Sequence, residues 1–226
     1  MTRLLAIDTS TWRAELALVE STDDGGPRVV AELALEVRDS HAQGLIGRID
    51  GLLGLAGWSR DTPDGYVAVR GPGSFTGIRV ALGTARGLAL ASGRPCFGVD
   101  TLTAMAEAHG PAELPRLTVL PAGRGEVFGA RFDAGSSPPR PLDDPWLAAL
   151  DQVPDRAAGS AVLVRAAGLD AIAATWLART ADLRGGPAVR GIAAAAGRLA
   201  LLDPDRDLPA VPLYVRSPDA VLPRRR

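Results

Sequence analysis

Two short polar turns carry the residues most suited to chemistry. Asp8-Thr9-Ser10 follows an apolar run at residues 4–7, and Gly71-Pro72-Gly73-Ser74 precedes a helical stretch. Backbone N–H groups of a glycine loop before a helix can bind an anion, and a carboxylate with hydroxyls can hold a metal-bound phosphate. The same residue types also form plain turns, in which Asp or Thr closes its own turn. Both interpretations stay open for a vestigial nucleotide or anion loop, which would comprise Asp8, Thr9, Ser10, Gly71, Gly73 and Ser74.

Other reactive chemistry is scarce in this chain. All 25 basic residues are arginine, so a Schiff base and a P-loop lysine are both excluded. Cys96 is the single cysteine and lies in an apolar run, which predicts a buried small hydrophobe rather than a catalytic thiol. His41 and His109 have no metal-ligating partner at helical spacing. The sequence therefore predicts no metal and no cofactor.

Length and charge favour an ordinary globular protein. The chain has 226 residues, 46% of them hydrophobic, and a net charge of −1. This length suits one large domain or two small lobes, and the charge gives no global signal for nucleic acid or an anionic membrane. No stretch approaches the ~20 apolar residues of a membrane span, and no secretory signal is evident at the N-terminus. We therefore expect a cytoplasmic protein that does not enter a membrane.

The hydrophobic pattern predicts a mixed sheet with helices packed on it. Strands are expected at 4–7, 15–19, 29–37, 66–69 and 96–99, and helices at 41–56, 75–91 and 101–108, the first capped by Asp39-Ser40. Further along, strands are expected at 117–120, 126–132 and 161–164, a helix at 192–202, and an extended end at 212–216. We expect an N-terminal lobe over 1–100 and a smaller lobe over 101–226, with the tail returning to the first lobe.

The helix expected at 41–56 has two distinct faces. One arc should face the core and contains Leu45, Ile46, Ile49, Leu52, Leu53 and Ala56. A separate narrow stripe contains Gly44, Gly47, Gly51 and Gly54. Each interior glycine costs roughly 1 kcal/mol relative to alanine, so the stripe needs a reason. Either another chain approaches it closely, or it reflects compositional bias or packing within the same chain.

The helix expected at 75–91 repeats this arrangement. Its core arc contains Phe75, Ile78, Leu82, Ala85, Leu88 and Ala89. Its second arc contains the small residues Thr76, Val80, Gly83, Thr84, Gly87 and Ala91, with Arg79 and Arg86 at the border. Two successive helices, each with a core face and a small-residue face, predict a subunit interface.

Five segments, in order, resemble the bacterial tRNA threonylcarbamoyladenosine biosynthesis protein family TsaB, also called YeaZ. They are Leu5-Ala6-Ile7-Asp8-Thr9-Ser10, Gly71-Pro72-Gly73-Ser74-Phe75-Thr76-Gly77-Ile78-Arg79, Gly98-Val99-Asp100-Thr101-Leu102, Arg124-Gly125-Glu126-Val127-Phe128 and Pro212-Leu213-Tyr214-Val215-Arg216. The resemblance implies an α/β fold of two lobes, shared by actin, sugar kinases and heat-shock ATPases (the ASKHA fold), with mixed sheets flanked by helices.

The resemblance also implies a role. Proteins of this family pair with a catalytic TsaD-type subunit through the two helices described above, and a TsaE-type ATPase joins them. The assembly transfers a threonylcarbamoyl group to the adenosine beside the anticodon of tRNAs reading codons that begin with A. It implies contact with tRNA mainly through the complex, and a homodimer is the alternative assembly when the chain is alone.

Differences from the catalytic relative predict a non-catalytic subunit. Thr101 and Met105 stand where that relative has a His-x-x-x-His metal pair, and Pro121 and Ala122 stand where it has two aspartates. Its glycine/asparagine motif cannot occur in a chain without asparagine. The segment Pro121-Ala122-Gly123 also departs from the usual run of the family. The alternative function is an ATPase or small-molecule kinase that uses Asp8 and the Gly71 loop, whereas the missing histidine pair argues against a metalloprotease.

Overall fold

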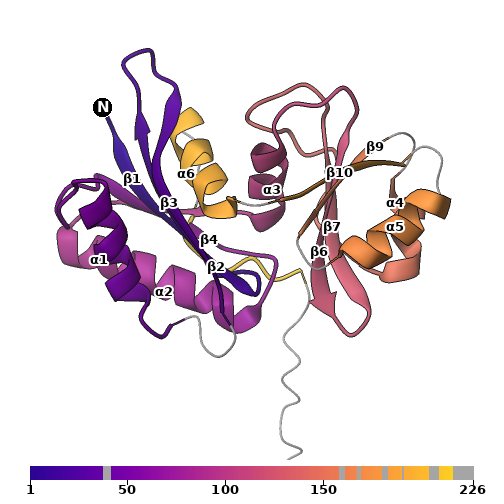
Figure 1. Cartoon of the computed structure of the whole chain (residues 1–226), viewed down its shortest axis with the longest axis horizontal. Helices are drawn as coiled ribbons and strands as arrows, with labels where there is room; N and C mark the ends of the chain where they lie inside the picture. The colour runs from indigo at the N-terminus through magenta and orange to yellow at the C-terminus, as the bar shows by residue number, and fades with distance from the viewer. Residues whose placement is uncertain are drawn as a thin grey trace, which may run out of the picture.

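Two five-stranded sheets organise the chain (Figure 1). The computed structural model describes residues 1–37, 42–157, 161–166, 169–179, 183–189, 191–203 and 209–215. The first sheet has the order β3-β2-β1-β4-β5 and the second β10-β9-β6-β7-β8. The strands of the first sheet are β1 (Arg3–Asp8), β2 (Arg13–Ser21), β3 (Pro27–Glu36), β4 (Gly65–Val69) and β5 (Cys96–Val99). Those of the second are β6 (Arg116–Gly123), β7 (Glu126–Phe132), β8 (Trp146–Ala149), β9 (Ala161–Ala166) and β10 (Leu183–Val189).

Both sheets are mixed, which follows from how their strands are connected. Short turns join β1 to β2 and β2 to β3, and these pairs are antiparallel. A helix precedes β4 and another joins β4 to β5, and β4 runs parallel to both β1 and β5. All five residues of β4 are buried, as expected for a parallel strand covered on both faces. In the second sheet β6 is antiparallel to β7 and parallel to β9.

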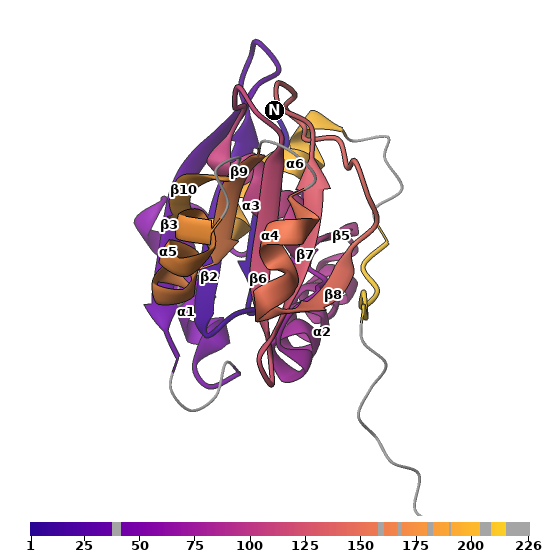
Figure 2. The same cartoon turned by 90° about the vertical axis from the view of Figure 1, so that its right-hand side faces the viewer.

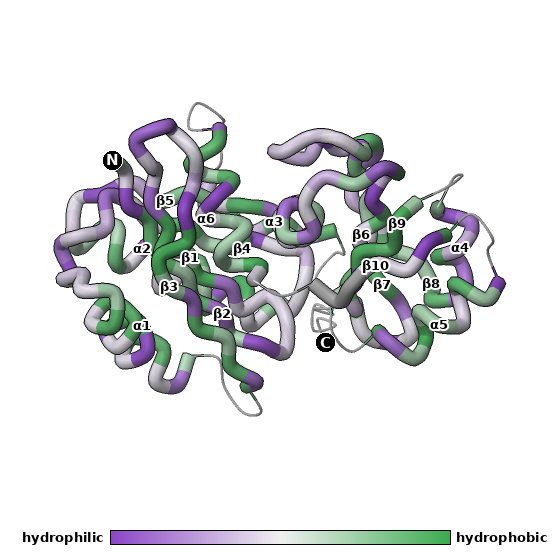
Figure 3. The backbone as a smooth tube through the Cα atoms, turned by 45° about the horizontal axis from the view of Figure 1, so that its top comes forward, coloured by the Kyte–Doolittle hydropathy of each residue, from purple (hydrophilic) through white to green (hydrophobic). Residues whose placement is uncertain are grey.

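The helices and sheets form five layers (Figures 1 and 2). Helices α1 (Leu45–Leu55) and α2 (Phe75–Ser92) cover the outer face of the first sheet, and α4 (Val153–Arg156) and α5 (Asp170–Arg179) cover the outer face of the second. Between the sheets lie α3 (Thr101–His109) and α6 (Ile192–Leu202), which contact each other. Hydrophobic residues follow the strands of both sheets and these two central helices (Figure 3). The central core therefore joins the two sheets through α3 and α6.

Most elements before residue 133 agree with the prediction, and the mixed α/β fold class is confirmed. The strands at 96–99 and 126–132 and the helix at 192–202 have the expected bounds, and α2 extends one residue beyond its expected end. The helix expected at 41–56 begins later, at Leu45. Its expected caps Asp39 and Ser40, together with His41, lie outside the described residues. β8, α5 and β10 were not predicted.

The segment at 209–215 returns to the first sheet. Pro209 forms an isolated antiparallel bridge with Phe97 in β5, and the Leu213 N–H donates to the Arg70 carbonyl at 2.8 Å. The expected extended end at 212–216 is not a strand, and its last residue, Arg216, lies outside the described residues. The division into lobes at residue 100 stays a prediction. No helix in the described ranges is long and apolar enough to cross a membrane.

Candidate partner-docking face and buried acidic turn

Helix α1 buries a narrower face than its sequence predicts. Leu45, Ile49, Leu52 and Leu53 are buried against the first sheet, but Ile46 is 51% exposed and therefore was wrongly placed in the core arc. The sheet contacts only the central stripe of the helix, so residues at the edge of the arc remain in solvent. Gly44 was also wrongly placed within the helix. It precedes the first turn with a φ of 71°, a left-handed conformation that favours glycine.

The glycines within α1 face open space. Gly47, Gly51 and Gly54 are exposed, and a Cβ added to any of them would meet no atom within 4 Å. Packing within the described chain therefore does not require glycine at these positions. The apolar side chain of Leu55, next to Gly54, is 86% exposed.

Helix α2 begins and ends as its sequence indicates. The Ser74 Oγ accepts a hydrogen bond from the Gly77 N–H at 3.2 Å, and Gly93 ends the helix with a φ of 67°. Residues of this helix that pack on the sheet are Gly77, Ile78, Ala81, Leu82, Ala85 and Ala89. Phe75 was wrongly assigned to the core arc, because its ring lies 42% exposed and contacts the Tyr214 ring instead. Leu88 is only half-buried.

The small-residue face of α2 lies on its outer side. Thr76, Gly83 and Gly87 are exposed, and Val80 and Thr84 are half-buried. A Cβ at Gly83 or Gly87 would meet no atom within 4 Å. Both helices lie on the same outer face of the first sheet (Figure 1). We call their small residues the docking face: Gly47, Gly51, Gly54, Thr76, Val80, Gly83, Thr84 and Gly87.

The turn after β1 is buried and closed by its own groups. Asp8 is fully buried, and its Oδ1 accepts a hydrogen bond from the Ser10 N–H at 2.8 Å. The Thr9 hydroxyl donates to the Gly77 carbonyl at 2.6 Å, which ties the turn to α2. Within the described residues, Asp8 Oδ2 and Ser10 Oγ have no hydrogen-bond partner. Burial and the nearby charge of Glu15 raise the pKa of Asp8 to about 7.

Sequence reasoning missed Glu15, which faces Asp8 across the β1–β2 pair. Its Oε2 accepts the backbone N–H of Ile192 at 2.6 Å and that of Ala193 at 3.4 Å, at the start of α6. The carboxylate thus binds the N–H groups with which a helix N-terminus could hold an anion. Burial raises the pKa of Glu15. The signal in the sequence was the position of Glu15 itself, because an acid inside the apolar run of β2 indicates a buried carboxylate with a binding partner.

The Gly71 loop is held by protein groups rather than open to a ligand. The Ser74 N–H donates to the Ser10 carbonyl at 2.7 Å, and the Gly71 carbonyl accepts the Thr101 N–H at 2.8 Å. Gly73 has a φ of 153°, and a Cβ there would lie 2.3 Å from the Ser10 carbonyl oxygen. The structure thus joins the two polar turns that the sequence singled out. It packs them against each other, with the turn after β1 buried and the Gly71 loop running out to the exposed Ser74.

The remaining sequence candidates lie elsewhere. Cys96 is half-buried, and burial raises the pKa of its thiol to about 11, which disfavours a reactive thiolate at neutral pH. Thr101 and Met105 are buried in α3, and Pro121 lies in β6. The described ranges contain no group of three or more His, Cys, Asp or Glu residues that could hold a metal ion.

Comparisons with known proteins agree with this architecture. The family profile of tRNA N6-adenosine threonylcarbamoyltransferase (TsaD) matches residues 29–140. The Escherichia coli tRNA threonylcarbamoyladenosine biosynthesis protein TsaB is 37% identical over 134 residues, which cover 58% of this chain and 54% of that protein. The matched part therefore spans about half the length of that relative. An uncharacterized protein of Mycobacterium bovis is 31% identical over 96% of this chain and 93% of its own length.

A solved structure shows the same arrangement over almost the whole chain. A Pseudomonas aeruginosa protein described as similar to peptidase YeaZ has a TM-score of 0.76 at 25% identity, covering 96% of this chain and 100% of that one. Two mixed sheets with helices between and outside them define the two-lobed ASKHA class. Within that class, the chain belongs to the TsaB (YeaZ-type) family.

Proposed function

We propose that this chain is a non-catalytic scaffold subunit in tRNA threonylcarbamoyladenosine biosynthesis. In this proposal it pairs with a TsaD-type catalytic subunit, and a TsaE-type ATPase joins the pair, in the cytoplasm. The complex would transfer the threonylcarbamoyl group to the adenosine beside the anticodon of tRNAs reading codons that begin with A. The TsaB name of the relatives supports the process.

The observation that carries the partner role is the open docking face. Five interior glycines, Gly47, Gly51, Gly54, Gly83 and Gly87, cost about 1 kcal/mol each relative to alanine. None of them is needed for packing within the described chain, because an added Cβ meets nothing within 4 Å. A helix of another chain that approaches these smooth surfaces closely would offset that cost. The exposed apolar residues beside them, Leu55 and Leu90, are each 86% exposed and would be buried by such a partner.

The buried acidic turn supports a non-catalytic role. An ATPase or kinase needs to hold phosphate near the end of β1, but Asp8 and Glu15 place two buried carboxyl groups there. Glu15 also binds the N–H groups at the start of α6. A phosphate would meet negative charge and donors that are already in use. The kinase alternative is therefore not favoured.

The docking face can be tested with leucine substitutions that the lone chain should tolerate. Gly47→Leu and Gly87→Leu add side chains to open space, so both variants should fold with a melting temperature close to the parent protein. Each should lose detectable binding to the TsaD-type partner in size-exclusion chromatography and calorimetry. Ala174→Leu places the same side chain at an exposed position of α5 and should bind normally. Heterodimer formation by both glycine variants at parental affinity would refute the proposed interface.

A further inference from the structure

A stacked aromatic and cationic cluster lies at the surface where α2 begins. The Arg79 guanidinium carbon lies 3.8 Å from the centroid of the Phe75 ring, and the Phe75 ring centroid lies 5.4 Å from that of Tyr214. The Arg79 Nε donates to the Tyr214 hydroxyl at 3.4 Å. Phe75 is 42% exposed and Tyr214 is 40% exposed. The cluster thus presents two aromatic rings and a guanidinium group, held in place, to solvent.

Tyr214 reaches this cluster because the returning segment is fixed to the sheet edge. The Leu213 N–H donates to the Arg70 carbonyl, and a Cβ on Gly71 would lie 2.6 Å from the Leu213 carbonyl oxygen. The close approach needs glycine at position 71, where φ is 113°. The aromatic pair is therefore preorganised by backbone contacts rather than by two free side chains.

The surroundings of the cluster are strongly basic although the whole chain is not. Residues 65–99 carry four arginines and no acidic residue, whereas the complete chain has a net charge of −1. Arg70 pairs with Asp100 and Arg94 pairs with Asp64. Arg79 and Arg86 are exposed and form no ion pair within the described residues. Their positive charge is therefore available to an anionic ligand.

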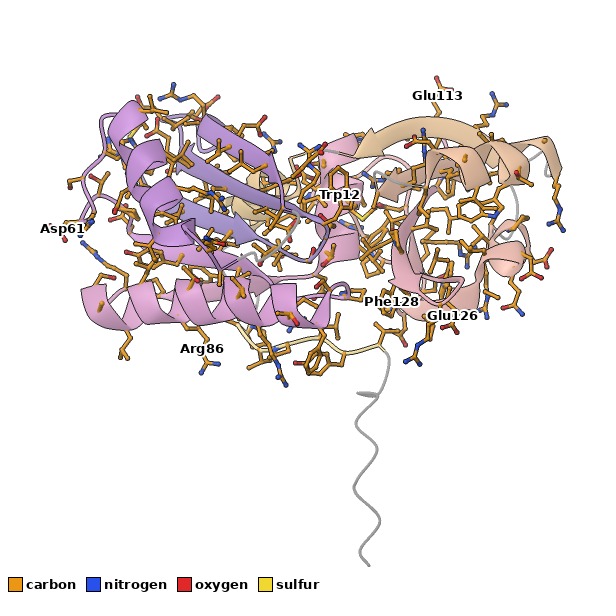
Figure 4. The ribbon with its side chains drawn as sticks, turned by 60° about the horizontal axis from the view of Figure 1, so that its bottom comes forward. Trp12, Asp61, Arg86, Glu113, Glu126 and Phe128 are labelled. Carbon is orange, nitrogen blue, oxygen red and sulfur yellow. The ribbon has the colours of Figure 1, made fainter. Side chains whose placement is uncertain are left out.

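Arg86 extends the cluster along α2. It lies seven residues after Arg79, two turns along the same side of the helix, and points away from the ribbon into solvent (Figure 4). Gly83 of the docking face lies four residues after Arg79 and three before Arg86, so the two arginines border that face, while Thr76 and Gly87 lie about 60–100° further around the helix. A ligand on the arginine side would therefore lie at the edge of the docking face, next to a bound partner.

We propose that Phe75, Arg79, Arg86 and Tyr214 form a binding site for single-stranded RNA. Bases stack on the exposed aromatic rings and the guanidinium plane, while Arg86 and the free nitrogens of Arg79 contact phosphates. Combined aromatic and arginine surfaces bind unpaired nucleotides in this way, since stacking tolerates any base and arginine supplies the charge. The choice of RNA rests on the proposed role in tRNA modification, where an anticodon loop would supply the unpaired bases.

The test measures binding of the lone full-length chain to a fluorescein-labelled anticodon stem-loop RNA by anisotropy. The parent protein should bind with an affinity that falls as salt rises. Arg86→Glu should weaken binding about tenfold and lower the slope of log affinity against log salt by about 0.7 or more. Tyr214→Ala should lose about tenfold, and Tyr214→Phe should retain most of the affinity because the ring remains. Arg140→Glu makes the same charge change at an exposed site in the second half of the chain and should bind like the parent.

Several outcomes would overturn the site. Parental affinity in both Arg86→Glu and Tyr214→Ala would do so, as would an equal loss in Arg140→Glu, since only net charge would then matter. Displacement of the RNA by polyglutamate at equal charge concentration would assign the surface to an acidic polypeptide instead. Because the assay contains no partner subunit, it is independent of the docking proposal. Tyr214→Ala, which changes no residue of α1 or α2, should still form the heterodimer, and this separates failure of this site from failure of the proposed function.

Discussion

Glycines have opposite surroundings in two regions of the molecule. One region is the outer face of α1 and α2, and the other lies around the turn after β1. On the docking face, a Cβ added to Gly51 or Gly87 would meet no atom within 4 Å beyond the adjoining backbone of its own helix. Against the turn, Gly73 in the loop before α2 and Gly77 in α2 are so crowded that an added Cβ would lie 2.3 Å and 1.8 Å from the backbone oxygens of Ser10 and Thr9, respectively. The same residue type thus marks a surface without an intrachain partner in one region and a fully occupied interior in the other.

This difference indicates where a ligand or partner can bind. In the turn after β1, Asp8 Oδ1 accepts the Ser10 N–H, Thr9 donates to Gly77 in α2, and the facing Glu15 binds the start of α6. The outer helices α1 and α2 differ, because each packs against the sheet on one side and faces solvent on the other. This contrast supports the proposal that partners bind on the outside of the first sheet.

The largest expected effect on stability comes from a substitution at a crowded glycine. Gly77→Ala places a methyl group 1.8 Å from the Thr9 carbonyl oxygen, so α2 or the turn must shift. We expect the free energy of unfolding to fall by about 3 kcal/mol or more, measured by urea denaturation. Gly83→Ala, in the same helix but on the open face, is the matched control and should not destabilise the chain. Equal stability of the two variants would show that the crowding has no energetic consequence.

A smaller effect on stability is expected when the buried Asp8 is replaced by asparagine. The pKa of Asp8 is raised to about 7, so the folded chain holds a proton that the unfolded chain, with a carboxyl pKa near 3.8, has released. Stability should therefore decrease as the pH rises from about 4 to 7 and level off above that. Asp8→Asn removes this carboxyl and should be more stable than the parent at pH 8 by about 2 kcal/mol or more, with little difference near pH 4.

The measurement is thermal or urea unfolding of both proteins across that pH range. Part of the slope should persist in Asp8→Asn, because the pKa of Glu15 is also raised. Asp23→Asn, at an exposed position in the β2–β3 turn, should follow the parent at every pH. A pH profile of Asp8→Asn identical to that of the parent would contradict the raised pKa.

The smallest expected effect on stability comes from a substitution at a glycine of the docking face. Gly51→Ala should stabilise the lone chain by about 0.5–1 kcal/mol, because alanine favours the helix and its methyl group meets no other atom. The same variant should not bind the TsaD-type partner more tightly, since the added methyl group lies where the partner helix approaches. Destabilisation of the lone chain, or tighter partner binding, would show that glycine serves another purpose there.

The sequence predicted the first sheet and α2 well because local signals agree with the tertiary contacts. Ser74 caps α2 and Gly93 ends it, and the apolar strands are bounded by clear turns. The second half offered weaker signals. β10 contains two glycines and a proline and shifts its register between Gly185 and Ala188, so its composition argues against a strand. Its partner strand β9, not its own sequence pattern, holds it in the sheet.

The site was only partly predictable for a similar reason. Helical periodicity predicted which small residues of α1 and α2 share one face. It could not predict how wide a face of α1 the sheet buries, so Ile46 was wrongly placed in the core. The two polar turns were found from residue type, but their contact depends on strand order. Glu15 and the start of α6 are 177 residues apart in the chain, and no local pattern reports that pairing.

Helix α6 has a consequence for how the chain forms during synthesis. It covers the inner side of β1 and β2, where Gly197 fits so closely that an added Cβ would lie 2.6 Å from Val19. Both strands leave the ribosome before α6, which follows β2 only after about 170 further residues have been made. Until then one apolar side of the first sheet lacks its cover, and an incomplete nascent chain would expose it to chaperones and to aggregation.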